Sequence, residues 1–188
     1  CSSMEARINS TEQECRTILR TCRELFAKKL HDYGAAWRIL RPESLTDQIY
    51  IKAERIRGIQ MRGHSAVDEG IEPEFIGIVN YGLIGMIQLE RGAVSSPDMS
   101  VEEALEAYDR CAEKTLQLML AKNHDYGEVW RNMRVTSMTD LILSKIHRTK
   151  QIEDLQGETF VSEGVEANYM DMVNYAIFCL IKLTLPAA

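Results

Sequence analysis

The sequence contains few prolines, few aromatic residues and no long apolar run. Only 4 of its 188 residues are proline, so little interrupts long helices, and aromatic residues at 7% are scarce for a β-sandwich. The best candidate for a membrane span, 175–181, ends at Lys182, well short of the roughly 18 residues that a span needs. No signal-peptide pattern is visible. We therefore expect a cytoplasmic protein with no part in the membrane.

Cysteines are also few, and their pattern is not that of a disulfide framework. There are 5 of them and no Cys-x-x-Cys. Cys15 and Cys22 would lie about 10.5 Å apart along a helix axis, too far for a disulfide. We expect buried, reduced thiols. Cys1 precedes Met4, and we interpret residues 1–3 as an extension before the natural start; the alternative is an acylated lipoprotein cysteine.

Positive charge is in deficit. The chain carries 22 Lys and Arg against 28 Asp and Glu, a net charge of −6. This acidity disfavours a protein that coats nucleic acid with its whole surface. Hydrophobic residues at 45% and charged residues at 27% are ordinary for a globular protein, and they exclude disordered and collagen-like chains. A chain of this length buries about 70% of its unfolded surface, so folding needs no metal and no disulfide.

Two stretches of the sequence are nearly the same. Residues 31–41 read HDYGAAWRILR and residues 124–134 read HDYGEVWRNMR, an offset of 93. The same offset pairs Ser44 with Ser137, Thr46 with Thr139, Asp47 with Asp140, Ile49 with Ile142, Lys52 with Lys145 and Arg55 with Arg148. After one inserted residue the offset is 94, and it pairs Glu72 with Glu166 and Asn80-Tyr81 with Asn174-Tyr175. We predict two helical repeats, 5–92 and 99–185, joined by a loop and packed as one globular unit.

Each repeat has apolar residues at helical spacing and no strand-like alternation. The predicted helices lie at about 12–30, after Ser44 or Thr46, after Pro73, at about 101–122, and at the two equivalent places of the second repeat. Ser100 with Glu103 forms a capping-box signature, and Gly34 and Gly127 are placed to act as left-handed caps. We predict an all-α bundle of about six main helices from two tandem three-helix repeats with pseudo-twofold symmetry.

Polar residues occupy places in the apolar stripes where core residues are expected. Lys52 and Asn80 lie among apolar residues at helical spacing, and Lys145 and Asn174 are placed in the same way. A buried ammonium group needs an anionic partner, and a buried amide needs hydrogen bonds. The candidate carboxylate partners are Asp32, Asp47 and Glu72 in the first repeat and Asp125, Asp140, Glu166 and Asp171 in the second.

Two interpretations of these repeated polar residues stay open. In the first they form a structural network, in which Asp47 caps a helix, Lys52 extends past the core to water and Trp37 packs. In the second they form a ligand site. We favour the second, because both repeats keep the same Lys, Arg, Asp and Asn, whereas a fold needs only apolar character at these places.

The charges favour an anionic ligand. Residues 28–57 hold seven Lys and Arg against four Asp and Glu, and residues 121–150 hold six against three, which is +3 in each block and −12 elsewhere. Two basic blocks in an acidic protein suit compact anions such as phosphates. Residues that could contact a phosphate are Arg38, Arg41, Arg131 and Arg134, and residues that could stack on a base are Trp37, Trp130, Tyr33 and Tyr126. The alternative is a pair of solvated basic faces.

The motifs resemble a known family. The run Lys122-Asn123-His124-Asp125-Tyr126-Gly127, then Lys145-Ile146-x-Arg148, then Glu163 and Asp171-x-x-Asn174-Tyr175, resembles the nucleotide-modification-associated domain 1 family. The first repeat matches through 31–34, Lys52, Arg55 and Asn80-Tyr81, so the resemblance covers nearly the whole chain as a tandem duplication. That family is remotely similar to the MazG-like all-α NTP pyrophosphatases, which are Mg²⁺-dependent.

The chain departs from that pattern in its carboxylates. The family usually has carboxylates one and two turns before its Asn-Tyr. The second repeat keeps Asp171 but has Ala167 at the earlier place, and the first repeat has Gly77 and Pro73. The resemblance therefore implies a metal site in the second repeat rather than in the first, with a composite site as the alternative.

Together these observations predict a nucleotide-binding protein of MazG-like type, with Mg²⁺-dependent nucleoside triphosphate pyrophosphohydrolysis as its candidate activity. In this prediction Asp171 and Glu163 hold Mg²⁺, with Asp140 as a further metal or catalytic candidate, and His31 and His124 are candidate general bases. The predicted ligand-binding residues are Lys52, Arg55, Asn80, Lys145, Arg148, Asn174, Trp37, Trp130 and Asp47. The expected partner is a nucleotide or another small phosphorylated ligand, and a homodimer stays open. The rival prediction is a non-catalytic helical interaction protein with a buried polar network.

Overall fold

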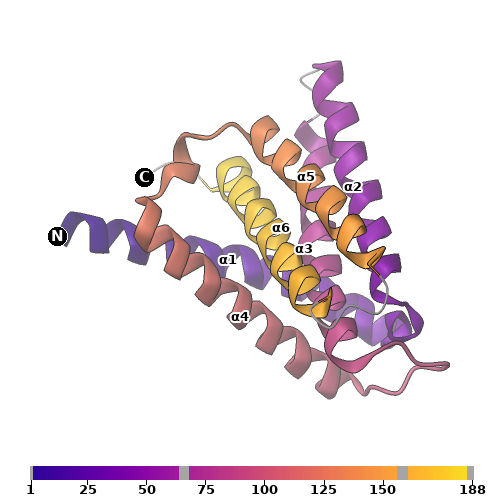
Figure 1. The fold of residues 1–188 in the computed structure, drawn as a ribbon. Coiled ribbons are helices and arrows are strands. Elements are labelled where there is room, and N and C mark those ends of the chain that lie inside the picture. The colour runs from indigo at the N-terminus through magenta and orange to yellow at the C-terminus, as the bar shows by residue number, and fades with distance from the viewer. Residues whose placement is uncertain (1, 64–67, 156–160, 186–188) are drawn as a thin grey trace.

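Six long helices and two short 3₁₀ turns make up the described part of the chain (Figure 1). The computed structural model describes residues 2–63, 68–155 and 161–185, and it has no strand in them. In chain order the elements are α1 (Ser2–Tyr33), η1 (Ala36–Ile39), α2 (Pro42–Arg62), α3 (Asp68–Arg91), α4 (Val101–Tyr126), η3 (Val129–Asn132), α5 (Val135–Glu153) and α6 (Val161–Thr184). The prediction of an all-α bundle of two three-helix repeats is confirmed.

The predicted helix boundaries were too narrow at three places. Helix α1 begins at Ser2 rather than near residue 12, and α2 begins at Pro42, where a proline at the first helical position needs no hydrogen-bond partner. Pro73 lies inside α3 instead of preceding it. Because this proline is close to the start of the helix, it removes only the hydrogen bond to the carbonyl of residue 69.

The predicted glycine caps and the capping box are confirmed, although α1 and α4 end at Tyr33 and Tyr126, a few residues after the predicted ends. Gly34 and Gly127 have φ values of +68° and +64°, and Gly127 donates to the Asn123 carbonyl at the end of α4. The capping box is present at the start of α4: Glu103 N–H donates to Ser100 Oγ at 3.1 Å, and Ser100 N–H donates to Glu103 Oε1 at 3.2 Å. The two 3₁₀ turns that follow the glycines were not predicted.

Helices α3 and α6 form the centre of the bundle. They pack on each other, α2 packs on α3, α5 packs on α6, and α1 and α4 lie against each other across one side (Figure 1). The centre is tight at Gly85 of α3, where an added Cβ would lie 2.7 Å from the ring of the buried Tyr169 of α6. This close approach needs glycine, whereas the equivalent residue of α6 is Cys179.

Reciprocal contacts between α2 and α5 follow the pseudo-twofold relation of the repeats. Thr46 of α2 donates to Glu153 Oε2 of α5 at 2.9 Å, and Gln60 of α2 donates to Thr139 Oγ1 of α5 at 3.1 Å. At the offset of 93 Thr46 corresponds to Thr139 and Gln60 to Glu153. The two contacts are therefore equivalent in place, but they differ in direction, because Thr46 donates to a carboxyl group whereas Thr139 accepts from an amide.

Burial changes the acidity of that carboxyl group. Desolvation raises the pKa of Glu153 to about 6, and the neighbouring carboxylates Glu43 and Asp47 act in the same direction. The hydroxyl of Tyr169 lies 2.6 Å from Thr46 Oγ1 and donates to the Pro42 carbonyl at 2.8 Å. Glu153 therefore belongs to a polar cluster between α2, α5 and α6.

The described cysteines confirm the sequence prediction. Cys15, Cys22, Cys111 and Cys179 are free and buried, and burial raises the pKa of each thiol. Cys1 lies outside the described residues. None of the described helices has the length and apolar character that crossing a membrane requires.

Candidate functional site

A cavity of about 330 Å³ lies in the second repeat. It is lined by residues of α4, η3 and α6 and by one residue that follows η3, namely Met119, Lys122, Asn123, Val129, Trp130, Met133, Asp171, Asn174, Tyr175 and Phe178. Six of these ten side chains are apolar or aromatic and four are polar or charged, a combination that suits a small-molecule site. We call it the second-repeat cavity.

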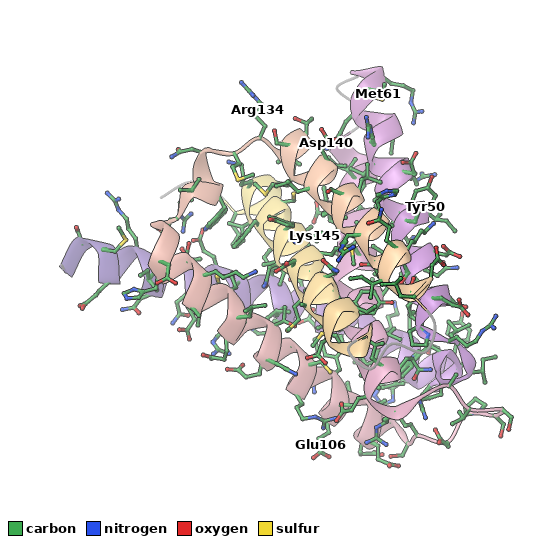
Figure 2. All side chains as sticks on the ribbon, viewed as in Figure 1. Tyr50, Met61, Glu106, Arg134, Asp140 and Lys145 are labelled. Atoms are coloured by element: carbon green, nitrogen blue, oxygen red, sulfur yellow. The ribbon has the colours of Figure 1, made fainter. Side chains whose placement is uncertain are left out.

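Two lysines converge on the carboxylate of this cavity. Lys122 Nζ of α4 lies 2.8 Å from Asp171 Oδ1, and Lys145 Nζ of α5 lies 3.1 Å from Asp171 Oδ2. The Asp171 side chain is only 15% exposed, whereas those of Lys122 and Lys145 are 51% and 34% exposed. Two ammonium groups face one carboxylate, so this group of three has a net charge of +1 beside an apolar cavity. Lys145 lies along α5 in Figure 2.

Trp130 contacts other side chains over its ring. It stacks on Phe178 with ring centroids 4.3 Å apart and an interplanar angle of 7°, and the guanidinium carbon of Arg131 lies 4.4 Å from its centroid. Its indole Nε1 is buried and makes no hydrogen bond. A base could stack on Trp130 only by displacing one of these neighbours. The predicted stacking residue is thus a cavity wall in this structure.

The repeated asparagines make the same bond in both repeats. Asn174 of α6 donates through Nδ2 to the Thr115 carbonyl of α4 at 3.2 Å, and Asn80 of α3 donates to the Cys22 carbonyl of α1 at 3.1 Å. Cys22 and Thr115 are themselves equivalent at the offset of 93. Each asparagine therefore ties the third helix of its repeat to the first helix. Asn80 also accepts a hydrogen bond from Tyr108, whereas Asn174 lines the cavity.

The first repeat neutralises its cations at a different place. Lys52 Nζ and Arg55 Nε of α2 each lie 3.2 Å from a carboxylate oxygen of Glu74, whose side chain is 14% exposed. Glu74 Oε2 is buried without a hydrogen bond of good geometry, so its contact with Lys52 is an ion pair only. None of the three candidate partners, Asp32, Asp47 and Glu72, pairs with Lys52, and the prediction of its partner was wrong.

A glycine in α3 explains why the carboxylate partner lies at a different place in the first repeat. Gly77 of α3 is the equivalent of Asp171, and an added Cβ at Gly77 would lie 3.0 Å from Lys52 Cε. The stem of Lys52 therefore lies over the backbone of Gly77 and reaches Glu74, three residues earlier in α3. Sequence comparison of the repeats did not find Glu74, because the equivalent residue of the second repeat is Asn168.

The predicted aspartates Asp47 and Asp140 lie where α2 meets α5. Lys150 Nζ lies 3.2 Å from Asp47 Oδ1, and Arg57 Nη1 lies 3.9 Å from Asp140 Oδ1. These two ion pairs are again equivalent between the repeats. Figure 2 shows Asp140 near the start of α5, and Asp140 does not line the second-repeat cavity. Their predicted roles in metal or ligand binding stay predictions.

Several other predicted residues are placed apart from the cavity. His31 and His124 lie in the last turns of α1 and α4 and are exposed, and neither lines the second-repeat cavity. Arg148 is exposed and lies 3.5 Å from Gln151, away from Asp171. Trp37 is half-buried, with its ring centroid 6.1 Å from that of Phe26. Glu163 lies in α6, and its side chain is outside the described part of the chain.

Two of the four arginines of the repeated motif, Arg38 and Arg131, make hydrogen bonds to other parts of the fold. Arg38 is 2% exposed and donates to Asp98 at 2.9 Å, to the Gly92 carbonyl at 2.8 Å and to Gln88. It thus fixes the segment that joins the repeats. Arg131 donates to Glu14 at 2.5 Å. Arg41 and Arg134 are exposed, and Figure 2 shows Arg134 pointing away from the bundle.

The described residues of the second repeat do not form a Mg²⁺ site as they are placed. In the described part of the chain no three His, Cys, Asp or Glu side chains come together as metal ligands would. Both oxygens of Asp171 already face ammonium groups, and Asp140 faces Arg57. A hard divalent cation needs several free oxygen ligands, which this arrangement lacks. Magnesium therefore stays a prediction from the resemblance.

Two residues that pair with the predicted ones, Lys122 in the second repeat and Glu74 in the first, were not chosen as site residues from the sequence. Lys122 precedes the repeated His-Asp-Tyr-Gly, and the equivalent Lys29 shares its charge, so the repeat itself carried a signal for it. Glu74 carried none, because it breaks the repeat. Lysines and carboxylates on different helices are brought together only by packing, which a single sequence does not specify.

The comparison with family models supports the resemblance. The model described as nucleotide modification associated domain 1 matches residues 29–89 and 122–183, one match in each repeat. Neither curated proteins nor solved structures give a match, so the similarity to MazG-like pyrophosphatases stays a prediction. The two matched segments contain Lys52, Glu74, Lys145 and Asp171. The chain belongs to the nucleotide modification associated domain 1 family, as a tandem pair of its domains.

Proposed function

We propose that the second-repeat cavity binds a nucleotide. The observation that carries this proposal is the convergence of Lys122 and Lys145 on Asp171, at 2.8 and 3.1 Å, at the border of an apolar and aromatic cavity. A phosphate group carries more charge than a carboxylate and more acceptor oxygens. It can therefore share or replace Asp171 as the partner of the two lysines, while the base and sugar occupy the cavity.

The two parts of the cavity suit the two parts of such a ligand. Met119, Met133 and Phe178 offer apolar surface to a base, and methionine adapts to flat rings of different outline. The amide of Asn174 already donates to the Thr115 carbonyl, so its Oδ1 is available as an acceptor. The cavity of about 330 Å³ is at the small end of ligand sites. One nucleotide for each chain is the expected stoichiometry.

The proposal concerns binding and includes no hydrolytic step. Both oxygens of Asp171 face lysines, and Asp140 does not line the cavity, so the cavity offers no carboxylate oxygen that is free of a cation to hold Mg²⁺ or to activate water. The pyrophosphohydrolase activity implied by the MazG-like resemblance would need these ion pairs to open. Magnesium dependence is therefore the property that separates binding from catalysis of that type.

The test is a panel of deoxynucleoside mono-, di- and triphosphates, added to the purified protein with EDTA or with Mg²⁺. We expect a rise in melting temperature with at least one nucleotide in EDTA, because the lysines need no metal. Release of pyrophosphate in Mg²⁺ would support the hydrolase alternative. Absence of both a thermal shift and turnover for every nucleotide would exclude the proposal and the alternative.

A second candidate is a non-catalytic interaction protein whose polar network fixes the bundle. Its support is the pair of equivalent bonds from Asn80 and Asn174 to helix carbonyls, together with the equivalent ion pairs of Asp47 and Asp140. These contacts give the repeated residues structural partners in both halves. This candidate predicts that substitution of Lys145 changes the melting temperature and no ligand response, whereas nucleotide binding predicts the reverse.

A further inference from the structure

The residue that begins the turn η3 has an unusual backbone. Glu128 has φ of +65° and ψ of +34°, and among the described residues other than glycine it alone has a positive φ. A residue with a Cβ is disfavoured in this left-handed region by roughly 1 kcal/mol. The surrounding structure must therefore hold it there. The equivalent residue of the first repeat is Ala35, with an ordinary φ of −86°.

The carboxylate of Glu128 is buried and fully engaged. The residue is 5% exposed, and it accepts hydrogen bonds from Thr11 of α1, from Asn123 Nδ2 at 3.3 Å and from Arg131 Nε at 3.4 Å. Arg131 in turn donates to Thr11 Oγ1 at 2.8 Å and to Glu14 Oε1 at 2.5 Å. A helix of the first repeat is thus tied to a turn of the second repeat.

This group of contacts holds one side of the second-repeat cavity. Asn123, Val129, Trp130 and Met133 all line the cavity, and all lie within the segment 123–133, which we call the cavity wall. Glu128 bonds directly to Asn123 and to the residue after Trp130. The residues of α1 that complete the contact, Thr11 and Glu14, lie outside the segments matched by the family model. The contact is therefore an addition to the matched domain.

We infer that Glu128 is a positioning residue, which ties the cavity wall to α1 and so sets the shape of the ligand site. We call its contacts with Thr11, Asn123 and Arg131 the latch. The inference rests on the proposed function, because it states how the nucleotide site is kept in order. The cost of the left-handed backbone and of a buried carboxylate is offset by the contacts to Thr11, Asn123 and Arg131. The first repeat has alanine here and no such latch.

Four substitutions test the latch. Glu128→Ala reproduces the first repeat, Thr11→Val removes the hydroxyl while keeping the volume, and Glu128→Gln keeps an acceptor oxygen for Thr11 and Asn123. The control is Thr21→Val on the same helix, because the Thr21 hydroxyl donates only to the Thr17 carbonyl of α1. For each variant, amide hydrogen exchange of the cavity wall is measured without ligand, and affinities are measured for a deoxynucleotide and for pyrophosphate.

Glu128→Ala and Thr11→Val are expected to speed exchange in residues 123–133 by about threefold or more, with no change in α5. They are also expected to weaken deoxynucleotide binding about tenfold. Pyrophosphate, which needs only Lys122 and Lys145, should bind as it does to the wild type. Glu128→Gln should restore most of both properties, and Thr21→Val should change neither.

Unchanged exchange of the cavity wall in both Glu128→Ala and Thr11→Val would overturn the latch, whatever the nucleotide affinities. Faster exchange with unchanged deoxynucleotide affinity would overturn the positioning role. If the wild type binds no nucleotide, the proposed function fails and the positioning role fails with it. In that case the exchange data still decide whether the latch exists.

Discussion

The two repeats have equivalent lysines on equivalent helices, but the carboxylates that pair with these lysines lie one helical turn apart. In the first repeat Lys52 lies over Gly77 and pairs with Glu74, and Arg55 pairs with the same carboxylate. In the second repeat the equivalent of Gly77 is Asp171, which holds Lys145 beside a cavity and gains Lys122 from α4. Duplicated units thus keep their fold contacts while one local change of carboxylate separates an ion-pair cluster from a candidate ligand site.

The repeated polar residues form contacts of the fold, whereas polar residues that are not repeated distinguish the two halves. The asparagine bonds, the threonine contacts and the aspartate ion pairs between α2 and α5 are present in both repeats. Glu74, Asp171 and Glu128 are not repeated. Repetition is therefore a guide to the architecture, and the departures from repetition are the guide to the site.

The largest effect, on stability, is expected from adding a side chain at Gly85 of α3, where the equivalent residue of α6 has one. Gly85→Ala would put a Cβ 2.7 Å from the ring of Tyr169, which is fully buried and hydrogen-bonded to the Pro42 carbonyl. We expect a loss of about 2 kcal/mol in the free energy of unfolding, in spite of the better helix propensity of alanine. Chemical denaturation of the variant measures it. A stability equal to that of the wild type would show that α3 and α6 can separate here at no cost.

A somewhat smaller effect is expected on ligand binding when the lysine of each repeat is replaced. Lys145→Met should weaken nucleotide binding about tenfold or more, because a charged hydrogen bond to phosphate is lost. Stability should change by less than about 1 kcal/mol, since this ion pair is partly exposed. Lys52→Met is the matched control in the first repeat and should leave the affinity unchanged. Equal losses in both variants would mean that the two repeats bind ligand alike.

Removal of the Asp171 carboxylate should strengthen ligand binding, whereas loss of a lysine weakens it. Asp171→Asn frees Lys122 and Lys145 from their competing anion, so pyrophosphate affinity in EDTA should rise by roughly threefold to tenfold. Glu74→Gln makes the same change of charge in the first repeat and should have no effect. Titration calorimetry measures both. A loss of binding in Asp171→Asn that appears only with Mg²⁺ would identify Asp171 as a metal ligand instead.

The smallest effect concerns the polar contact that differs between the repeats. Because the pKa of Glu153 is raised to about 6 in the folded protein from an ordinary value of 4.5, the folded state binds this proton more tightly than the unfolded state. The stability that the folded protein gains from protonation of Glu153 is complete below pH 4.5 and is lost as the pH rises towards 6. Glu153→Gln, which copies Gln60, should raise stability at pH 7 by about 1 kcal/mol, after a discount for partial exposure.

Denaturation curves at several pH values compare Glu153→Gln with the wild type. The difference in stability between them should be largest above pH 6 and smallest below pH 4.5. Gln60→Glu is the reverse change at the equivalent place of the first repeat, and it should lower stability at pH 7. A difference that does not depend on pH would show that the pKa of Glu153 is the same in the folded and the unfolded protein.

The sequence predicted the architecture because helical spacing and repetition are local or internal properties of the chain. The apolar stripes with Ile49, Ile56, Ile142 and Ile146 are buried as predicted. The start of α1 was placed late, because residues 3–10 are mostly polar and exposed and give little helical pattern. The contact of Thr11 with Glu128 joins residues 117 positions apart, and no local sequence pattern predicts it.

The site was predictable only in part. Lys145, Asp171 and Asn174 were chosen because they repeat or match the family pattern, and the structure brings all three to the second-repeat cavity or its border. Asp140, Arg148 and both histidines were chosen for the same reason and lie elsewhere. A repeated polar residue looks the same in sequence whether it closes a helix contact or faces a ligand.

The central claim is that ligand binding belongs to the second repeat alone. Titration calorimetry of the purified protein with the nucleotide that gives the largest thermal shift tests it most directly. We expect one site for each chain, retained in Lys52→Met and weakened about tenfold or more in Lys145→Met. Two sites for each chain, or equal losses in the two variants, would contradict the account.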